Sequence, residues 1–151
     1  MAQHNVFVYG TLKEGFWNHH HLKGAHKIGV GLTHGRFGMW NVGFPLIRHE
    51  KDCAGYPAEG MGQVRGEVYR VSDKHMASMD RLENNGRMYQ REEVRVHCTN
   101  AAGQTETVLA WCYVWMLGPQ GRPVPAKDGI IDWDGRDDDD DEVGLSDDGE
   151  D

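Results

Sequence analysis

The stretch VRGEVYRVSDKHMASMDRLENNG, residues 64–86, combines the two periodicities that decide the fold. Residues 63–71 alternate apolar or small side chains with arginine and glutamate, as in a half-buried strand. Ser72 can then cap a helix, whose apolar side chains recur at helical spacing. The sequence NNG at residues 84–86 can end that helix in the left-handed region. We therefore predict a strand followed directly by one helix.

The remaining patterns up to residue 116 favour strands. Residues 6–9 (VFVY) predict a short buried strand, and residues 91–98 alternate cleanly. Residues 24–44 contain six glycines among β-forming residues, which favours curved and bulged strands. Residues 105–116 are largely apolar on both faces, which predicts a central strand. The fold class is therefore α+β: a small, strongly curved mixed β-sheet or partial barrel with one main helix packed on it.

The charge of the chain is divided between a mildly basic body and an acidic end. Residues 132–151 hold 12 acidic residues and one arginine, a net charge of −11, and residues 1–131 carry +3. The six consecutive carboxylates at 137–142 repel one another and can bury almost nothing, which predicts disorder. We expect one folded domain, residues 1–131, followed by a disordered acidic C-terminal tail, residues 132–151. A solubilising role, binding of a basic partner and folding back on the body all fit the tail, so its partner is unknown.

Several classes of protein do not fit this composition. No run approaches the ~18 apolar residues of a membrane span, so no membrane partner is expected. The N-terminus lacks the basic and apolar regions of a secretory signal, and the three cysteines form no CxxC pair. A reduced, cytoplasmic location is therefore expected. The tryptophans are not interleaved with basic residues, so no nucleic-acid partner is expected either.

The run His19-His20-His21 raises the question of a metal site. Adjacent side chains on a helix or strand point in different directions, so the three rings cannot easily face one ion. No cysteine or carboxylate stands at a supporting spacing. We therefore predict no metal site.

Glu83 is the most informative residue, because its helical position should turn it inward. Met76, Met79 and Glu83 are spaced i, i+3 and i+7, so they share one face. Glu83 also falls in the last helical turn, where the helix dipole disfavours further negative charge. Burial and the dipole would both raise its pKa, as suits a general acid–base near neutral pH. The spacing leaves open that Glu83 instead reaches water or pairs with Arg87 or Arg91.

Tyr9, Gly10, Thr11 and Leu12 follow the first predicted strand. Such a turn can point successive N–H groups in one direction and so bind an anion. Gly10 would let the backbone approach a ligand closely. An ordinary turn at the end of a strand fits the same four residues.

Three blocks of the sequence together resemble the γ-glutamylcyclotransferase-like superfamily, most closely its γ-glutamylamine cyclotransferase branch. The first is VFVYGTLKEG at residues 6–15, followed by Asn18-His19. The second is VRGEVYRV at residues 64–71, and the third is MDRLE at residues 79–83, followed by YQR at 89–91. The blocks stand in the family's order and span roughly residues 5–115. The loop after Glu83 and the acidic tail depart from the family pattern.

The resemblance implies an intramolecular acyl transfer on a small-molecule γ-glutamyl substrate. The α-amine of an L-γ-glutamyl group attacks its own side-chain amide, which yields 5-oxoproline and a free amine or amino acid. Glu83 would be the catalytic acid–base, and the backbone of residues 9–12 would hold the substrate carboxylate or the oxyanion. Tyr89 would donate a hydroxyl in the pocket, and Arg91 would neutralise a substrate carboxylate or pair with Glu93. The nucleophile belongs to the substrate, so no cofactor is implied.

A rival hypothesis is a non-catalytic module of the same fold that binds a small ligand. A pocket that only binds a carboxylate-bearing ligand would gain nothing from a buried carboxyl. Glu83 therefore favours the enzyme over the binding module.

Overall fold

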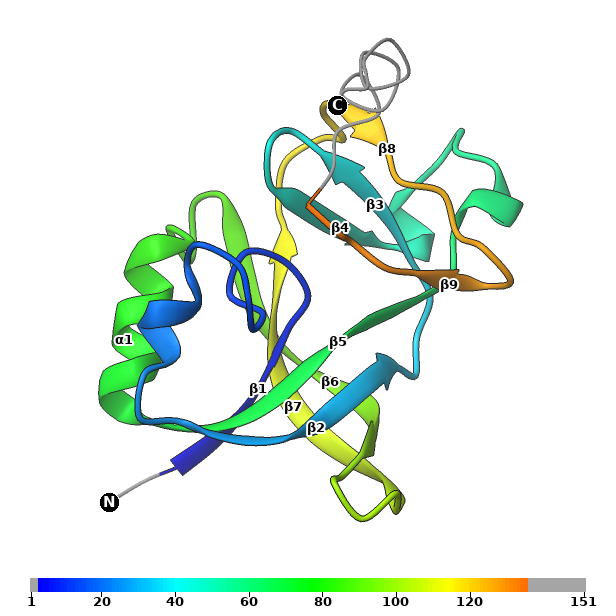
Figure 1. The fold of residues 1–151 in the computed structure, drawn as a ribbon. Helices are drawn as coiled ribbons and strands as arrows, with labels where there is room; N and C mark the ends of the chain where they lie inside the picture. Colours follow the sequence, from blue (N-terminus) through cyan, green and yellow to red (C-terminus); the bar gives the residue numbers. More distant parts are fainter. Residues whose placement is uncertain (1–2, 136–151) are drawn as a thin grey trace, which may run out of the picture.

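Five long strands close into a small barrel in the computed structural model, which describes residues 3–135 (Figure 1). Each strand is paired on both sides in the cyclic order β1-β7-β6-β2-β5, because β1 pairs with both β7 and β5. The β1–β7 pairing is parallel and the other four are antiparallel, so the predicted mixed, strongly curved sheet is confirmed. The strands are β1 (Gln3–Val8), β2 (His26–Thr33), β5 (Gln63–Ser72), β6 (Tyr89–Thr99) and β7 (Thr105–Trp115).

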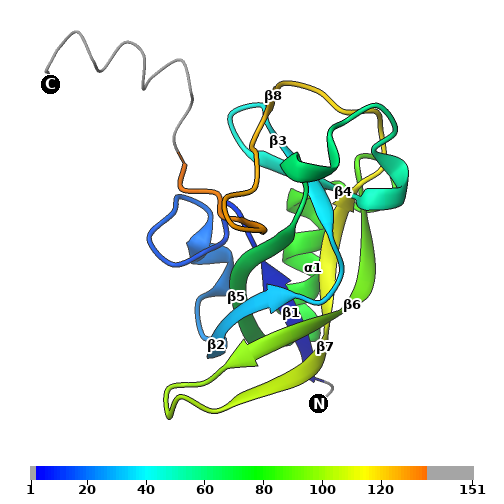
Figure 2. The same ribbon diagram turned by 90° about the vertical axis from the view of Figure 1, so that its right-hand side faces the viewer.

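A second, smaller sheet stands at one end of the barrel (Figures 1 and 2). Its strand order is β4-β3-β8, and the short strand β9 pairs in parallel with β5. Two single-turn 3-10 helices, η2 (Glu50–Asp52) and η3 (Ala58–Gly60), connect β4 to β5. The small strands are β3 (Phe37–Asn41), β4 (Pro45–His49), β8 (Arg122–Pro123) and β9 (Ile130–Ile131).

Curvature and burial along the strands follow the sequence patterns. The register of β2 against β5 shifts between Lys27 and Gly29, which is the kind of irregularity that the glycine-rich segment predicted. β7 lies between β1 and β6, which confirms the prediction of a central strand. Its N-terminal part runs out along the β6–β7 hairpin, where Leu109 is exposed.

The helix α1 (Asp73–Leu82) begins directly after β5, as predicted. The Ser72 side chain accepts a hydrogen bond from the His75 backbone N–H, and His75 Nδ1 accepts one from the Ser72 N–H, at 3.1–3.2 Å. This reciprocal pair is a capping box that satisfies two amide groups at the helix start. The helix ends where Asn84 and Gly86 take positive φ angles of 53° and 95°.

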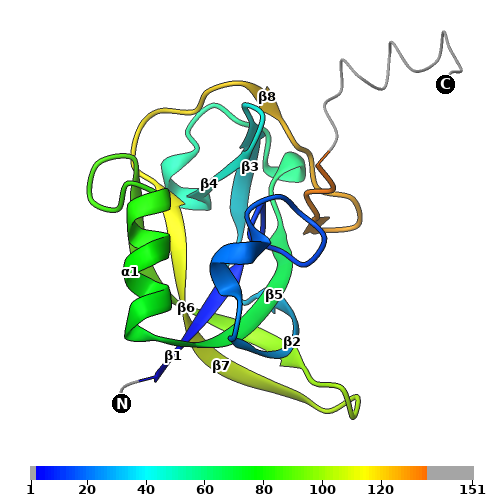
Figure 3. The ribbon, with the colours of Figure 1, turned by 60° about the vertical axis from the view of Figure 1, so that its left-hand side comes forward.

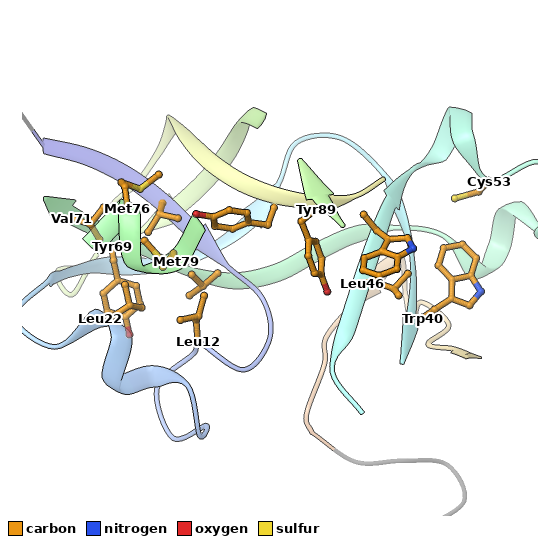
Figure 4. Packing of buried hydrophobic residues seen from close by; sticks show 14 of the residues in the cluster. Leu12, Leu22, Trp40, Leu46, Cys53, Tyr69, Val71, Met76, Met79 and Tyr89 are labelled. Carbon is orange, nitrogen blue, oxygen red and sulfur yellow. The ribbon is translucent and has the colours of Figure 1, made fainter. Parts of the chain in front are cut away.

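The helix packs its two methionines, Met76 and Met79, against the barrel (Figure 4). On the same side lies the 3-10 helix η1 (His19–Leu22), next to α1 (Figure 3). In Figure 4, Tyr89 lies between this group of side chains and the group around Trp40 and Leu46 on the small sheet. Tyr89 is therefore placed at the junction of barrel and small sheet.

The predicted acidic tail lies largely outside the described residues, which end at residue 135. Of its first residues, Trp133 is buried against Phe16, with ring centroids 5.1 Å apart. The ammonium group of the buried Lys13 donates to the Trp133 backbone carbonyl at 2.6 Å. Residues just after the proposed boundary at 131 thus contact the loop that follows β1. Within residues 3–135, no helix has the length and apolar composition to cross a membrane.

Gly66 marks a tight approach between β5 and β1, and it yields a stability prediction. A Cβ atom at this position would lie 2.3 Å from the Val8 carbonyl oxygen and 2.7 Å from the Phe7 ring. Both neighbours are held in the barrel, so Gly66→Ala should destabilise the fold by about 1–3 kcal/mol through overpacking. Thermal unfolding measures this loss. Gly118→Ala is the matched control, because a Cβ there meets nothing within 4 Å; equal melting temperatures for the two variants would contradict the prediction.

Candidate active site

A cavity of about 380 Å³ opens between the end of α1, the loop after β1 and the start of β4. Its volume is in the range of small-molecule sites. In Figure 3, α1 and the loop after β1 lie on the same side of the sheet. The cavity thus joins two of the motifs singled out in the sequence, the segment 9–12 and Glu83, and Tyr89 also lines it.

The segment Tyr9–Leu12 supplies backbone and hydroxyl groups to this cavity. Its carbonyls are used locally, because the Gly10 carbonyl accepts from the Lys13 N–H and the Thr11 carbonyl from the Asn18 N–H, both at 3.0 Å. Within residues 3–135, the N–H groups of Gly10, Thr11 and Leu12 have no hydrogen-bond acceptor in the protein. These donors are therefore available to an oxyanion or a carboxylate in the cavity.

The Thr11 hydroxyl is oriented by its neighbour in the same loop. Its oxygen accepts a hydrogen bond from the Asn18 side-chain amide at 2.9 Å, which leaves the hydroxyl proton for a ligand. The structure adds a second requirement for glycine at position 10. A Cβ at Gly10 would lie 2.5 Å from the Pro45 ring, so the glycine allows the loop to approach the opposite wall of the cavity.

Glu83 stands at the C-terminal cap of α1 and lines the cavity as a partly buried carboxyl. Its backbone N–H closes the helix by donating to the Met79 carbonyl at 2.9 Å. Among the described residues, its carboxyl has no ion pair, so the alternative of pairing with Arg87 or Arg91 is not found. Burial raises its pKa to about 7. The carboxyl can therefore accept and return a proton near neutral pH.

Tyr89 lines the cavity, but its hydroxyl proton is already used. The hydroxyl donates to the Pro45 carbonyl at 2.9 Å, and burial raises the pKa of the phenol well above its ordinary value. Its oxygen can therefore accept a hydrogen bond from a ligand, such as one from an ammonium group. The prediction that Tyr89 donates its hydroxyl proton to a ligand is therefore wrong, because the start of β4 brings the Pro45 carbonyl within reach of that hydroxyl.

Arg91 is not brought to the cavity, which corrects its predicted role in binding. Its guanidinium lies 3.6 Å from the Asp80 carboxylate and covers the Trp111 ring at 5.0 Å. The same carboxylate accepts a hydrogen bond of 2.6 Å from the Tyr113 hydroxyl. Arg91 thus forms its ion pair with Asp80 on α1, and not with Glu93. Arg91 and Asp80 thus hold the hydroxyl end of Tyr113, a residue that itself lines the cavity.

Nine further side chains, and Gly43, line the cavity without having been predicted as site residues. They come from strands, loops and the end of α1, which are far apart in the sequence. Asn18 stood beside a quoted motif, and Tyr113 stood on the predicted central strand, but neither pattern indicated a site. The nine side chains are those of Phe7, Val8, Trp17, Asn18, Phe44, Pro45, Leu82, Met88 and Tyr113.

The three consecutive histidines turn their Nδ1 atoms to three different partners. His19 Nδ1 lies 2.9 Å from the Leu12 carbonyl and His20 Nδ1 lies 3.0 Å from the Trp17 carbonyl. His21 Nδ1 lies 2.9 Å from the Ser78 hydroxyl on α1. Across residues 3–135, no three side chains of the metal-binding types are gathered around one point. The histidines hold the loop after β1 in place beside α1.

The raised pKa of Glu83 predicts a pH-dependent change in stability. The folded state holds the proton of Glu83 up to about pH 7, whereas the unfolded chain releases it near pH 4.5. The free energy of unfolding should therefore fall as pH rises through this window. Glu83→Gln removes the effect, so the variant should gain stability relative to wild type between pH 4.5 and 7.

Chemical denaturation at several pH values measures this difference. Glu106→Gln, which removes an exposed carboxyl of the β6–β7 hairpin, is the control for the loss of one negative charge. A stability difference between Glu83→Gln and wild type that is constant from pH 4 to pH 8 would contradict the assignment of a raised pKa.

Comparisons with known proteins place this fold and cavity in a family. The sequence profile described as "Gamma-glutamyl cyclotransferase, AIG2-like" matches residues 6–134. A candidate gamma-glutamylcyclotransferase of Methanocaldococcus jannaschii is 32% identical over 112 residues, which cover 73% of this chain and 82% of that protein. Gamma-glutamylaminecyclotransferase A of Danio rerio is 29% identical over 116 residues, which cover 71% of this chain and 67% of that protein.

A solved structure shares the architecture. The crystal structure of an AIG2-like protein from Mus musculus superposes with a TM-score of 0.61 at 26% identity, covering 76% of this chain and 78% of that one. The matched region of the sequence profile spans the barrel from Val6 onward, the helix and every residue that lines the cavity. This chain belongs to the gamma-glutamyl cyclotransferase, AIG2-like family.

Proposed function

We propose that the protein is a cyclotransferase that converts an L-γ-glutamyl amine or amino acid to 5-oxoproline and the free amine. The observation that carries this proposal is one cavity lined both by Glu83, whose pKa burial raises to about 7, and by Gly10, Thr11 and Leu12, whose backbone N–H groups have no acceptor within residues 3–135. The family membership of the chain supports the same reaction class. The finer assignment to γ-glutamylamines rests on the likeness to relatives such as that of Danio rerio.

The reaction begins with removal of a proton from the substrate's α-ammonium group, which is mostly protonated at pH 7. Glu83 in its ionised form accepts this proton. The freed amine attacks the γ-carbonyl carbon of the same glutamyl group and forms the new C–N bond of a five-membered ring. Because both reacting groups belong to one molecule, the enzyme's task is to hold the chain in a folded conformation.

The carbonyl oxygen becomes an oxyanion as the ring closes. The N–H groups of Gly10, Thr11 and Leu12 can stabilise either this charge or the substrate's α-carboxylate. The protonated Glu83 then gives its proton to the leaving nitrogen, and the original amide C–N bond breaks. The ring nitrogen, which carries two protons after the attack, loses one of them to solvent as the oxyanion collapses to the lactam carbonyl. The products are 5-oxoproline, the free amine and one proton, and Glu83 returns to its ionised form, so no external reactant is consumed.

The test is a set of L-γ-glutamyl donors incubated with the purified protein and analysed for 5-oxoproline by mass spectrometry. We expect release of 5-oxoproline and the free amine in equal amounts from at least one donor. The matching D-γ-glutamyl compounds control for spontaneous cyclisation. If the protein binds these donors but releases no 5-oxoproline, the enzyme hypothesis is wrong and the rival hypothesis holds, in which the protein only binds its ligand.

A further inference from the structure

Lys13 is a buried charged residue that the proposed reaction does not use. It is only 8% exposed, and it follows directly on the segment 9–12. Taking an ammonium group out of water is costly unless the group is paired and hydrogen-bonded. A methionine could fill much of the same space without that cost. The reason for a lysine therefore lies in the contacts of its ammonium group.

The ammonium group of Lys13 contacts the C-terminal end of the described chain. It donates to the Trp133 carbonyl at 2.6 Å and lies 3.5 Å from the Asp132 carboxylate. It also lies 5.2 Å from the centroid of the Phe16 ring, in a cation–π contact. These contacts compensate the buried charge. They also join the loop after β1 to residues that follow β9, 120 positions further along the chain.

Aromatic packing adds to the same junction. The buried Trp133 ring lies 5.1 Å from the Phe16 ring and 5.9 Å from the Trp17 ring, measured between centroids. A Cβ at Gly135 would lie 2.7 Å from the Phe16 ring, so the contact extends to the last described residue. Figures 2 and 3 show this orange end of the chain beside the blue loop after β1. The loop and residues 132–135 therefore pack as one unit.

The segment 10–12 depends on this junction for its place in the cavity wall. Among the described residues, its hydrogen bonds all run to residues 13–19, so they shape the loop without attaching it to the rest of the protein. A polar attachment also exists at Glu14, whose N–H donates to the Glu67 carboxylate at 2.9 Å. Glu14 is exposed, however, whereas the attachment at Lys13 is buried and charged. A charge-assisted hydrogen bond of this kind is stronger than one between neutral groups.

We infer that Lys13 is a positioning residue for the proposed cyclotransferase, on which this inference rests. By fixing the loop to the Trp133 carbonyl, it holds the N–H groups of residues 10–12 where an oxyanion or a carboxylate can meet them. Lys13 does not line the cavity, so it acts through the loop and touches no substrate. A misplacement of about 1 Å at such groups can cost about 10²-fold in rate. It follows that residues 132–133, beyond the expected domain boundary at 131, are part of the working enzyme.

Lys13→Met tests this role, because methionine keeps an apolar stem but cannot donate to the Trp133 carbonyl. We expect kcat/KM for 5-oxoproline release to fall at least tenfold with the L-γ-glutamyl donor that the wild type uses best. Lys127→Met is the matched control, because Lys127 is an exposed lysine between β8 and β9, and it should retain the wild-type value. Melting temperatures show whether both variants are folded. A folded Lys13→Met protein with kcat/KM within a factor of about three of wild type would overturn the inference.

Amide order parameters measure the positioning itself and do not depend on activity. In ¹⁵N relaxation experiments, the wild-type amides of residues 10–12 should have values near 0.85, as in rigid backbone. In Lys13→Met they should fall clearly below this value, while those of α1 stay unchanged. Unchanged order parameters at residues 10–12 would overturn the inference and leave the proposed function standing. If the wild type releases no 5-oxoproline from any donor, the proposed function fails, and the catalytic role of Lys13 fails with it.

Phe16→Leu provides a second variant at the same junction. Phe16 is half-buried and outside the cavity lining, and leucine removes the ring that packs on Trp133. We expect a several-fold fall in kcat/KM, and this result carries the test if Lys13→Met does not fold. Because both substitutions release the same loop, the double variant should lose less than the product of the two separate losses. Losses that multiply, or an unchanged kcat/KM in Phe16→Leu, would overturn the inference.

Discussion

Glu83→Gln is expected to lower the rate of 5-oxoproline release about 10²–10⁴-fold, the usual contribution of a general acid–base. Glutamine has nearly the same shape but cannot accept the proton of the α-ammonium group or return one to the leaving nitrogen. Glu83 also has no ion pair among the described residues, so the substitution breaks no salt bridge. The loss should therefore appear in kcat much more than in KM. Steady-state kinetics with mass-spectrometric detection of 5-oxoproline measures it.

The control for this experiment is Glu106→Gln, which changes an exposed carboxyl on the β6–β7 hairpin and should retain wild-type kcat. Melting temperatures of both variants show whether each one is folded. A folded Glu83→Gln enzyme with kcat within a factor of about three of wild type would exclude Glu83 as the group that moves the proton.

The pH profile of wild-type kcat/KM should show an acid limb with a midpoint of about 7, set by Glu83. Below this pH the carboxyl is protonated and cannot accept a proton from the substrate. At pH 5 only about 1% of the enzyme would hold the carboxylate, so kcat/KM should be about 100-fold below its plateau. Initial rates between pH 5 and pH 8.5, with the enzyme's stability checked at each pH, measure the limb.

Two donors with different leaving amines provide the control for this profile. The acid limb belongs to the free enzyme and the glutamyl group, so its midpoint should not move between donors. A limb near pH 4.5, the ordinary value for glutamate, would mean that burial does not tune Glu83 in solution. A midpoint that follows the leaving amine would assign the limb to the substrate.

The sequence predicted the structure correctly wherever a pattern within one helix or strand determines it. The spacing of Met76, Met79 and Glu83 predicted that the Glu83 carboxyl shares the inward face of the helix, because a helix repeats every 3.6 residues. The capping serine and the residues NNG correctly predicted where that helix begins and ends. The apolar character of both faces of β7 correctly predicted its central place. Each of these inferences needs only neighbours along the chain.

The sequence was less informative where contacts join distant segments. The partner of Arg91 is Asp80 on α1, a choice made by the packing of helix on strand rather than by the strand's own pattern. The Tyr89 hydroxyl donates to the Pro45 carbonyl, 44 residues away, because the small sheet folds over the end of the barrel. The cavity likewise joins the loop after β1, the start of β4 and the end of α1, which no local period relates. These features follow from closure of the barrel, which a single sequence does not reveal.

The most direct test of the proposed proton transfer is a ¹³C NMR titration of the Glu83 carboxyl carbon in protein labelled with [5-¹³C]glutamate. The spectrum of Glu83→Gln identifies the signal by its absence. A carboxyl buried in the cavity should titrate with a midpoint of about 7, the same value as the acid limb of kcat/KM. A midpoint near 4.5, or one that differs clearly from the kinetic limb, would contradict a proton carrier at this position.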